Sequence, residues 1–382
     1  MKIKNIESQR FSSSYGNNNS FGQPLGLKSI VIITVTSQDL IKSSSELYTG
    51  IYIPDILPLM IDYVAKSFIG KEFDIKNTNF FADIPFVSNS GTFKSIQGAI
   101  QNCIMQIIFK ENNLSIVEGI KTFLQKNYQR NNNSTPIKYY LSGGSVAYSI
   151  EETLNDAKAA LNTNYDGFKM RCGLQHIDVD YKRVTAVRSF FEENSKKKGN
   201  YNINLMVDFI QGTLRPPLSA EKTAFNINYL RNGILWFEEP LDPDKLFEYK
   251  KLRNNIDPSI SLAVGESFTT FAEYQAFSDL IQFFQLDVTH GGGYIDLFHI
   301  TNNLLSINPN LQFTSHVWGS GLAILLNLAF ARATNIISWF EIPMVELEIN
   351  QNLFNNTDKN YLNIWWPHPD SNRDGNKSQR IL

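Results

Sequence analysis

The chain has 382 residues, of which 42% are hydrophobic and 19% are charged, and its formal net charge is −2 at pH 7. This is the composition of a globular protein, long enough for one large domain and a smaller one, with no basic block to follow a nucleic-acid backbone. It has no apolar run near the ~20 residues of a membrane span, no apolar signal segment at its start and only two cysteines, so we expect a cytoplasmic protein without membrane partners.

Residues 1–135 predict a small α+β domain. A β-branched run at Val31–Thr36 predicts a strand, and helical patterns occur at Leu57–Phe68 and Ser95–Phe109. The polar stretch Phe11–Ser20 predicts a loop between this strand and a shorter one near the N-terminus. A second polar stretch, at residues 131–135, marks the predicted end of the domain.

From residue 136 onward, short β-rich runs alternate with helical patterns, which predicts βαβ units and a parallel sheet. The clearest helical patterns are Ser149–Leu161, Asp180–Glu192, Ala220–Leu230 and Leu322–Ala333. There are eight β-rich runs: Lys138–Leu141, Gly167–Arg171, Asn204–Asp208, Leu235–Glu239, Leu262–Glu266, Phe283–Asp287, Gln312–His316 and Ile337–Glu341. Eight strands paired with helices are typical of a closed barrel. The predicted class is α/β, a modified (β/α)8 TIM-type barrel over residues 136–349.

Each of the last seven β-rich runs carries an ionisable residue at or next to its end. These residues are Lys169 with Arg171, Asp208, Glu238, Glu266, Asp287, His316 and Glu341. In a parallel barrel the carboxyl ends of the strands open on one face, where active sites are built from several strands. One such carboxylate alone is usually a helix cap, but five around one opening would repel one another without a cation. The pattern predicts a site for a hard ion such as Mg²⁺.

Six strings in a fixed order carry a resemblance to a known family. They are Phe168-Lys169-Met170-Arg171-Cys172-Gly173, Leu205-Met206-Val207-Asp208, Trp236-Phe237-Glu238-Glu239-Pro240, Gly265-Glu266-Ser267, Leu286-Asp287 followed by Gly291-Gly292-Gly293, and His316-Val317-Trp318-Gly319. In content and order they resemble the motifs of the mandelate racemase-like, acid-sugar dehydratase-like subgroup of the enolase superfamily. More weakly, Glu46–Pro54 resembles the loop region of the family's capping domain. The resemblance implies that residues 1–135, completed by residues 350–382, cap the barrel.

The resemblance makes three of the carboxylates metal ligands and Mg²⁺ the implied cofactor. The ligands are Asp208, Glu238 and Glu266. Neighbouring residues on a strand point to opposite faces, so only one of Glu238 and Glu239 can reach a central metal if the strand stays regular, and the family pattern selects the first.

The resemblance also implies a general base. In the family an Asp-His dyad removes the proton next to the substrate carboxylate, and Asp287 with His316 hold those positions. A carboxylate on the adjacent strand would fix the tautomer of the histidine and raise its basicity. Lys169 and Glu341 would help to stabilise the enediolate. The implied substrate is a small hydroxy acid, and we favour acid sugars.

Arg171 departs from the family pattern, which often has a second lysine at this position as the base on the opposite face of the substrate. Arginine keeps its proton at ordinary pH, so we expect the residue at this position to bind an anionic group and not to act as a base. Without a second base, the expected enzyme is a lyase that dehydrates its substrate to a 2-keto-3-deoxy acid. A racemase or epimerase with Lys169 as second base, and a non-catalytic sugar-acid binder, are the alternatives. Trp318 and His290 are candidate substrate contacts. The sequence does not determine which acid sugar is the substrate or whether the protein forms a homo-oligomer.

Overall fold

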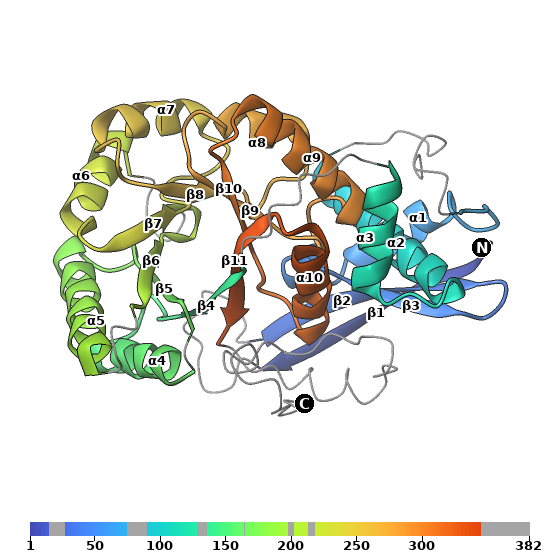
Figure 1. Ribbon diagram of the computed structural model, residues 1–382, viewed down its shortest axis with the longest axis horizontal. Coiled ribbons are helices and arrows are strands. Elements are labelled where there is room, and N and C mark those ends of the chain that lie inside the picture. Colours follow the sequence, from blue (N-terminus) through green and yellow to red (C-terminus); the bar gives the residue numbers. More distant parts are fainter. Residues whose placement is uncertain are drawn as a thin grey trace.

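The computed structural model describes residues 1–14, 27–74, 90–127, 136–163, 165–197, 202–212 and 218–344. An antiparallel sheet with its helices lies beside a closed parallel barrel (Figure 1). The predicted fold class, an α/β barrel with a separate N-terminal unit, is therefore confirmed. Residues 131–135 and 350–382 lie outside the described residues, and the predicted domain boundaries stay predictions.

The N-terminal unit is built on a three-stranded antiparallel sheet within the described residues. Its strands are β1 (Ile3–Ser14), β2 (Leu27–Ser37) and β3 (Lys42–Leu47), in that order across the sheet. The prediction of a loop at Phe11–Ser20 was wrong for its first four residues, because Phe11 to Ser14 belong to β1 and pair with β2. The hydroxyls of Ser12 and Ser29 also form a hydrogen bond of 2.8 Å. Polar residues stay in the strand here because the ladder is held by backbone groups.

The helices described for this unit are α1 (Leu57–Ala65), α2 (Gly91–Glu111) and α3 (Ile116–Asn127). α2 packs on β2 and β3 and also against α9 (Gly293–Ile307) of the barrel, and α3 packs against α2 and α10 (Gly321–Thr334). Gly98 permits the close approach of α2 and α9, since a Cβ there would lie 2.3 Å from the carbonyl carbon of Gly292. The N-terminal unit is thereby held directly against the loop that follows β9 (Phe283–Leu286).

The barrel consists of eight strands that pair in parallel with their neighbours. In chain order they are β4 (Lys138–Gly143), β5 (Gly167–Arg171), β6 (Asn204–Asp208), β7 (Ile234–Glu238), β8 (Leu262–Val264), β9, β10 (Gln312–Ser315) and β11 (Ile337–Pro343). Within the described residues, helices follow the first seven of them: α4 (Ile150–Asn162), α5 (Ile177–Lys197), α6 (Ala220–Leu230), α7 (Leu246–Asn255), α8 (Phe271–Phe277), α9 and α10.

Three of the predicted strands are shorter than expected. Glu266, Asp287 and His316 lie just past the ends of β8, β9 and β10. At β8 the reason is local, because Gly265 has a φ of +118° and turns the chain out of the sheet before Glu266. These side chains therefore sit in the loops at the barrel mouth rather than in the hydrogen-bonded ladder.

Large side chains fill the barrel interior beneath this mouth. The cluster consists of Tyr140, Met206, Trp236, Ala263, Phe283 and Trp339. The indole of Trp236 donates to Glu238 Oε2 at 3.2 Å, and Lys169 Nζ lies 5.5 Å from the ring centroid of Tyr140. The ionisable residues thus pack on a mainly aromatic cluster, which shields them from water on the side of the barrel interior.

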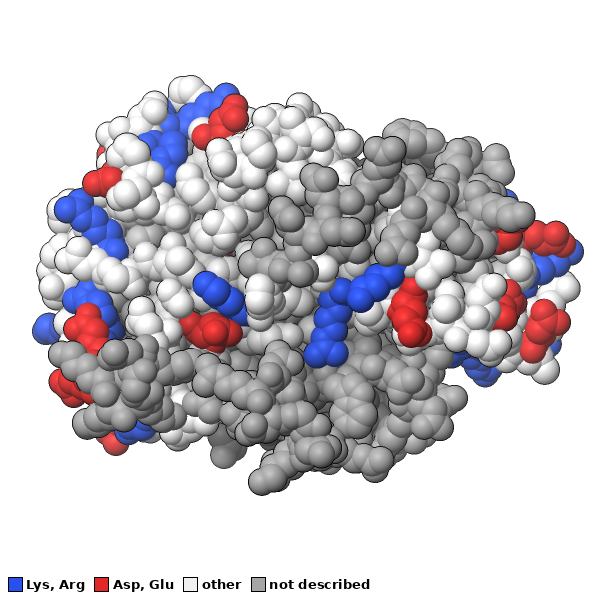
Figure 2. Space-filling view, viewed as in Figure 1, with Lys and Arg blue, Asp and Glu red and all other residues white. Residues whose placement is uncertain are grey.

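Charged side chains are spread over the face of the molecule shown in Figure 2. Where charged side chains of the described residues are visible there, lysines and arginines lie close to aspartates and glutamates. Among the helices of the described ranges, none combines the length and apolar character that crossing a membrane requires.

Candidate active site

Lys169 joins two carboxylates at the centre of the barrel mouth. Its Nζ lies 2.5 Å from Glu238 Oε1 on β7 and 2.8 Å from Glu341 Oε1 on β11, and all three side chains are buried. Burial alone would lower the pKa of Lys169, but the charges of Glu238 and Glu341 outweigh it and raise this pKa well above its ordinary value. In this arrangement Lys169 is a cation that donates hydrogen bonds.

Arg171 lies on the same strand and borders the same group. Its Nη1 donates to the carbonyl of Gly143 at 3.0 Å, and its Nε lies 3.6 Å from Asp208 Oδ2. The guanidinium carbon is 4.3 Å from the ring centroid of Trp318, a cation–π contact. A guanidinium in this position can orient an anion but is a poor proton acceptor.

The three predicted metal ligands come from consecutive strands. Asp208 and Glu238 are register partners on β6 and β7, and Glu266 follows β8. Burial raises the pKa of Glu238 to about 7; Lys169 opposes this rise, and the charge of Asp208 adds to it. Burial also raises the pKa of Glu266, against the charge of His316. The three carboxylates are therefore crowded together at a site with little access to water.

The donor chemistry of these carboxylates fits a hard cation such as Mg²⁺, which prefers oxygen ligands. As placed, however, they face protein donors: Glu266 Oε1 accepts from Gln211 Nε2 at 2.6 Å, and Asp208 Oδ1 accepts from the Ile210 N–H at 2.7 Å. No group of three or more metal-ligating side chains is gathered with metal-site geometry in the described part of the chain. Each of these carboxylates keeps lone pairs beyond those that its present donors use.

Glu239, next to Glu238 in sequence, has different partners. Its Oε1 accepts from the Gly265 N–H at 2.8 Å, and its Oε2 accepts from the Tyr249 hydroxyl at 3.4 Å. The φ of Glu239 is +39°, so the chain leaves the strand geometry directly after β7. Glu239 thus ties the loop after β7 to the loop after β8, while Glu238 faces Lys169.

Asp287 and His316 meet beyond the ends of β9 and β10. His316 Nδ1 lies 3.4 Å from Asp287 Oδ2. Asp287 Oδ1 accepts from the Thr289 N–H at 2.8 Å, the Thr289 hydroxyl at 2.6 Å and Asn327 Nδ2 at 2.9 Å. Burial alone would raise the pKa of Asp287, but these hydrogen bonds and His316 hold it below its ordinary value. An ionised Asp287 can hold the imidazole in one orientation.

The second nitrogen of His316 faces the predicted metal ligands. Its Nε2 lies 3.5 Å from Glu266 Oε2. Burial alone would lower the pKa of His316, whereas the hydrogen bond to Asp287 and the charges of Glu266 and Glu341 raise it to about 9. Neutralising Glu266 would remove part of this rise and bring the imidazole nearer to the range of a base at neutral pH.

Glu341 closes the ring of ionisable residues next to β10. Its Oε2 accepts from the Val317 N–H at 2.7 Å, and its Oε1 lies 2.8 Å from Lys169 Nζ. Burial alone would raise the pKa of Glu341, but the charges of Lys169 and His316 hold it below its ordinary value. Glu341 is therefore a hydrogen-bond acceptor in this structure.

The two predicted substrate contacts have partners within the protein. Trp318 has Lys28 Nζ 4.8 Å from its ring centroid, in addition to Arg171. His290 Nε2 lies 3.1 Å from the Ser267 carbonyl, and its Nδ1 lies 3.2 Å from Ser95 Oγ. Because both nitrogens of His290 are engaged, a substrate would reach this ring only by displacing one of these groups. Contact of either residue with substrate stays a prediction.

Four polar residues in or beside this group do not stand out as site residues in the sequence: Lys28, Glu46, Gln211 and Asn327. Asn327 had a usable signal, since it is the one polar residue in the apolar run from Gly321 to Ala331. An isolated polar side chain in a buried helix needs a partner, and Asn327 finds it in Asp287. Glu46 follows three serines and offers no such contrast.

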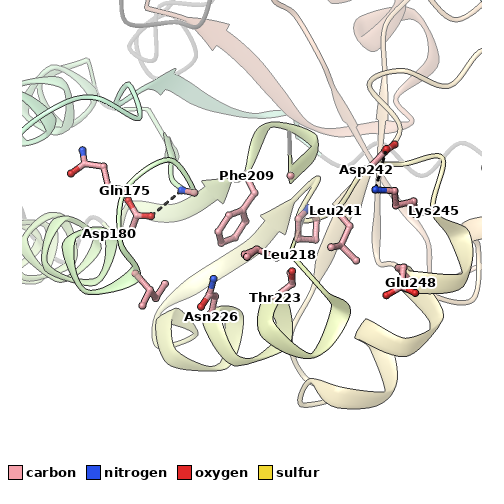
Figure 3. Close-up of a pocket in the computed structure, with 14 residues that line it drawn as sticks. Gln175, Asp180, Phe209, Leu218, Thr223, Asn226, Leu241, Asp242, Lys245 and Glu248 are labelled. Atoms are coloured by element: carbon pink, nitrogen blue, oxygen red, sulfur yellow. Dashed lines mark hydrogen bonds and ion pairs between the residues drawn. The ribbon is translucent and has the colours of Figure 1, made fainter. Parts of the chain in front are cut away.

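A separate pocket lies behind the ends of β5, β6 and β7, between the loops after these strands and α6 (Figure 3). Its lining includes Gly173, Phe209, Asn226 and Leu241. None of the predicted site residues is among the described residues that line it. The candidate active site is therefore defined by the ionisable side chains at the barrel mouth, not by this pocket.

Fold and site together define a parallel barrel with a buried group of acids and bases at its mouth, next to a separate N-terminal unit. Residues 152–360, more than half of the chain, match the family described as Enolase C-terminal domain-like. The chain belongs to this family. The recognition made from its six motifs is thereby confirmed.

Relatives of known activity are similar to part of the chain. D-galactarolactone cycloisomerase of Agrobacterium fabrum is 25% identical over 203 residues, which are 52% of this chain and 49% of that protein. Arabinonate dehydratase of Saccharolobus solfataricus is 22% identical over 221 residues, which are 57% of this chain and 55% of that protein. The chain thus spans about half the length of these curated relatives.

Among solved structures, an enolase from Bradyrhizobium complexed with magnesium and mandelic acid has a TM-score of 0.70 to this chain. The match covers 89% of this chain and 87% of that one, at 15% identity. At this level of identity the likeness shows the shared fold, including the N-terminal unit beside the barrel.

Proposed function

We propose that this protein is a Mg²⁺-dependent enzyme that removes the proton next to the carboxylate of a hydroxy acid, with acid sugars as its substrate class. One observation carries the proposal. An Asp-His pair, a buried lysine and four further carboxylates meet at one barrel mouth, each at or near the end of a different strand. The names of the relatives, a dehydratase and a cycloisomerase of sugar-derived compounds, support the substrate class.

Asp208, Glu238 and Glu266 would hold the ion, which when bound supplies positive charge to the substrate carboxylate as the enediolate forms. His316 takes the α-proton on Nε2, while Asp287 holds Nδ1. Lys169 donates a hydrogen bond toward the developing negative charge, as preorganised donors do in other active sites. Arg171, Trp318 and Glu341 border the substrate.

We propose dehydration as the outcome. After His316 has taken the α-proton, the β-hydroxyl leaves with that proton as water, and the remaining enol becomes a 2-keto-3-deoxy acid. Inversion of the α-carbon would instead require a proton donor on the face opposite His316. Arginine is a poor proton acceptor, and Lys169 already donates to two carboxylates, so neither side chain favours a second base.

Isomerisation is the second candidate, because one relative is a cycloisomerase. Lys169 shares a strand face with Arg171 and would be the second acid-base group in a racemase or epimerase. The two outcomes use the same first step and differ only in the fate of the enediolate.

The deciding experiment is incubation of the protein and Mg²⁺ with a panel of acid sugars in D₂O, followed by NMR. We expect a 2-keto-3-deoxy acid with deuterium at C3. Deuterated, stereo-inverted hydroxy acid without keto acid would replace the dehydratase by an isomerase. Binding without deuterium uptake across the whole panel would reject proton abstraction and leave a sugar-acid binder.

A further inference from the structure

Two charged residues of the N-terminal sheet are buried against the barrel. Lys28 on β2 is 1% exposed, and Glu46 on β3 is 0% exposed. Both contact the residues that join β10 to α10, His316–Ser320, which we call the β10–α10 segment. The mechanism proposed above uses His316 and Trp318 from this segment but assigns no role to Lys28 or Glu46.

Glu46 is bonded to the last residue of the segment. Both carboxylate oxygens accept from the Ser320 N–H at 3.1 Å, and Oε2 also accepts from the Ser320 hydroxyl. The same hydroxyl caps α10 by accepting from the Leu322 N–H at 3.2 Å. Gly319 allows this approach, since a Cβ there would lie 2.6 Å from Glu46 Oε1. The sequence of the segment is thus adapted to a carboxylate from another unit.

Lys28 is bonded to the middle of the segment. Its Nζ donates to the carbonyl of Trp318 and lies 4.8 Å from the ring centroid of the same residue. Burial lowers the pKa of Lys28 to about 7, against the charge of Glu46, and burial raises the pKa of Glu46. Both charges are therefore costly to bury. A protein with hydrophobic residues of similar size at these positions would often be at least as stable.

The chain that follows β3 reaches His316 itself. The ring of Tyr48 packs edge-on to the ring of His316, with centroids 4.9 Å apart and planes at 80°. The Tyr48 N–H donates to the carbonyl of Thr289 at 3.2 Å, next to the loop that carries Asp287. The N-terminal unit thus touches both loops of the Asp-His pair.

We propose that Glu46 and Lys28 are positioning residues, which hold the β10–α10 segment so that His316 stays aligned with Asp287 and Glu266. The catalytic part of this inference rests on the proposed function, whereas the fixing of the segment does not. The N-terminal unit would then act on the base through the backbone of this segment. The competing explanation is a structural ion pair that contributes only stability.

Hydrogen exchange tests the fixing of the segment without any substrate. Glu46→Gln keeps the size of the side chain but replaces one acceptor oxygen by an amide group that cannot accept from Ser320. Glu7→Gln is the matched control, because Glu7 is an exposed residue of the same sheet. We expect amide exchange of peptides covering 317–322 to rise at least about tenfold in Glu46→Gln only. Unchanged protection would overturn the inference.

Kinetics test the consequence for His316. Small displacements of a reacting group can cost about a hundredfold in rate, so we expect kcat of Glu46→Gln to fall roughly ten- to a hundredfold. KM and the Mg²⁺ activation constant should change less than about threefold, because no substrate or metal ligand is altered. Wild-type kcat in a folded Glu46→Gln variant would overturn the positioning role. If the wild-type protein lacked activity, the proposed function would fail, but hydrogen exchange would still show whether Glu46 fixes the β10–α10 segment.

Lys28→Met, alone and combined with Glu46→Gln, separates positioning from charge pairing. Lys4→Met, at an exposed position of β1, is its control. If the two charges only balance each other, the double variant should regain both melting temperature and kcat. We expect the melting temperature to recover and kcat to stay low, since the double variant still lacks the bonds to Trp318 and Ser320. Recovery of kcat would reject the inference. If Glu46→Gln does not fold, hydrogen exchange of residues 317–322 and kcat of Lys28→Met test the inference instead.

Discussion

The barrel mouth contains two acidic regions with opposite electrostatic character. On the side of β6 to β8, burial raises the pKa of Glu238 and of Glu266. On the side of β9 to β11, burial would do the same to Asp287 and Glu341, but hydrogen bonds and neighbouring cations lower both pKa values. The two regions thus differ because hydrogen bonds and cations outweigh burial at Asp287 and Glu341, whereas neighbouring carboxylates add to it at Glu238 and Glu266.

The hydrogen-bond donors around the carboxylates differ between the two regions. Asp287 and Glu341 accept from backbone N–H groups, from Asn327 and from Lys169, all supplied by this chain. The carboxylates of the other region also have donors, such as Lys169 and Trp236 for Glu238 and Gln211 for Glu266, but the charges of neighbouring carboxylates add to the effect of burial there. We infer that the β9–β11 region is complete as folded, whereas the β6–β8 region needs a cation from outside. The following predictions test this difference.

Removing divalent metal should have the largest effect. If the β6–β8 region needs Mg²⁺, the EDTA-treated protein should lose turnover entirely and regain it when Mg²⁺ is added in excess. Initial rates of the chelated protein against Mg²⁺ concentration measure this. Melting temperature in EDTA is the control for unfolding. Undiminished turnover in EDTA would refute a metal role for these carboxylates.

Replacing the base should have the next largest effect. His316→Asn should lower kcat by about 10²–10⁴-fold, the usual cost of losing a general base. Mg²⁺ affinity by titration calorimetry should change far less than kcat, because His316 contacts the proposed ligand Glu266 but is not itself one of the three proposed ligands. His176→Asn serves as the control, since this side chain is 74% exposed. A variant that retained more than about a hundredth of the rate would speak against His316 as the base.

The adjacent glutamates provide a sharper test of the β6–β8 region. Glu238→Gln should weaken Mg²⁺ binding at least about tenfold, because a charged ligand is lost. Glu239→Gln should change it less than about threefold, since Glu239 is bonded to Gly265 and Tyr249 and an amide oxygen can still accept from one of them. Calorimetric titration of both variants measures the difference. The reverse order would exchange the roles of the two residues.

Asn327 tests whether the β9–β11 region stabilises itself. Asn327→Ala removes the donor to Asp287 Oδ1 and the acceptor of the Val288 N–H, both at 2.9 Å. Leaving these buried groups unpaired should lower the free energy of unfolding by about 1–3 kcal/mol. Asn303→Ala, at an exposed position of α9, should change it by less than about 0.5 kcal/mol. Equal values in denaturant titrations of the two variants would contradict a self-supporting region.

Local sequence determined the barrel and the ring of ionisable residues. β-rich runs recur at the length of one βα unit, and the residues at their ends must then meet at one mouth, whatever the packing details. Lys169, Asp208 and Glu238 could be placed from the sequence for this reason. The alternation of side chains along a strand predicted that Glu238 and Glu239 would differ, but it is the positive φ of Glu239, just past β7, that gives the two side chains different partners.

The partners of these residues were decided only by the tertiary structure. Glu46 and Ser320 are 274 positions apart, and no local periodicity relates a strand of one unit to a loop of another. The same holds for Lys28 with Trp318, and for Ser95 with His290. Sequence periodicity reports which way a side chain points within its own element. Which donor or acceptor it meets there depends on how separately formed elements pack, because buried polar groups take the partners that packing brings to them.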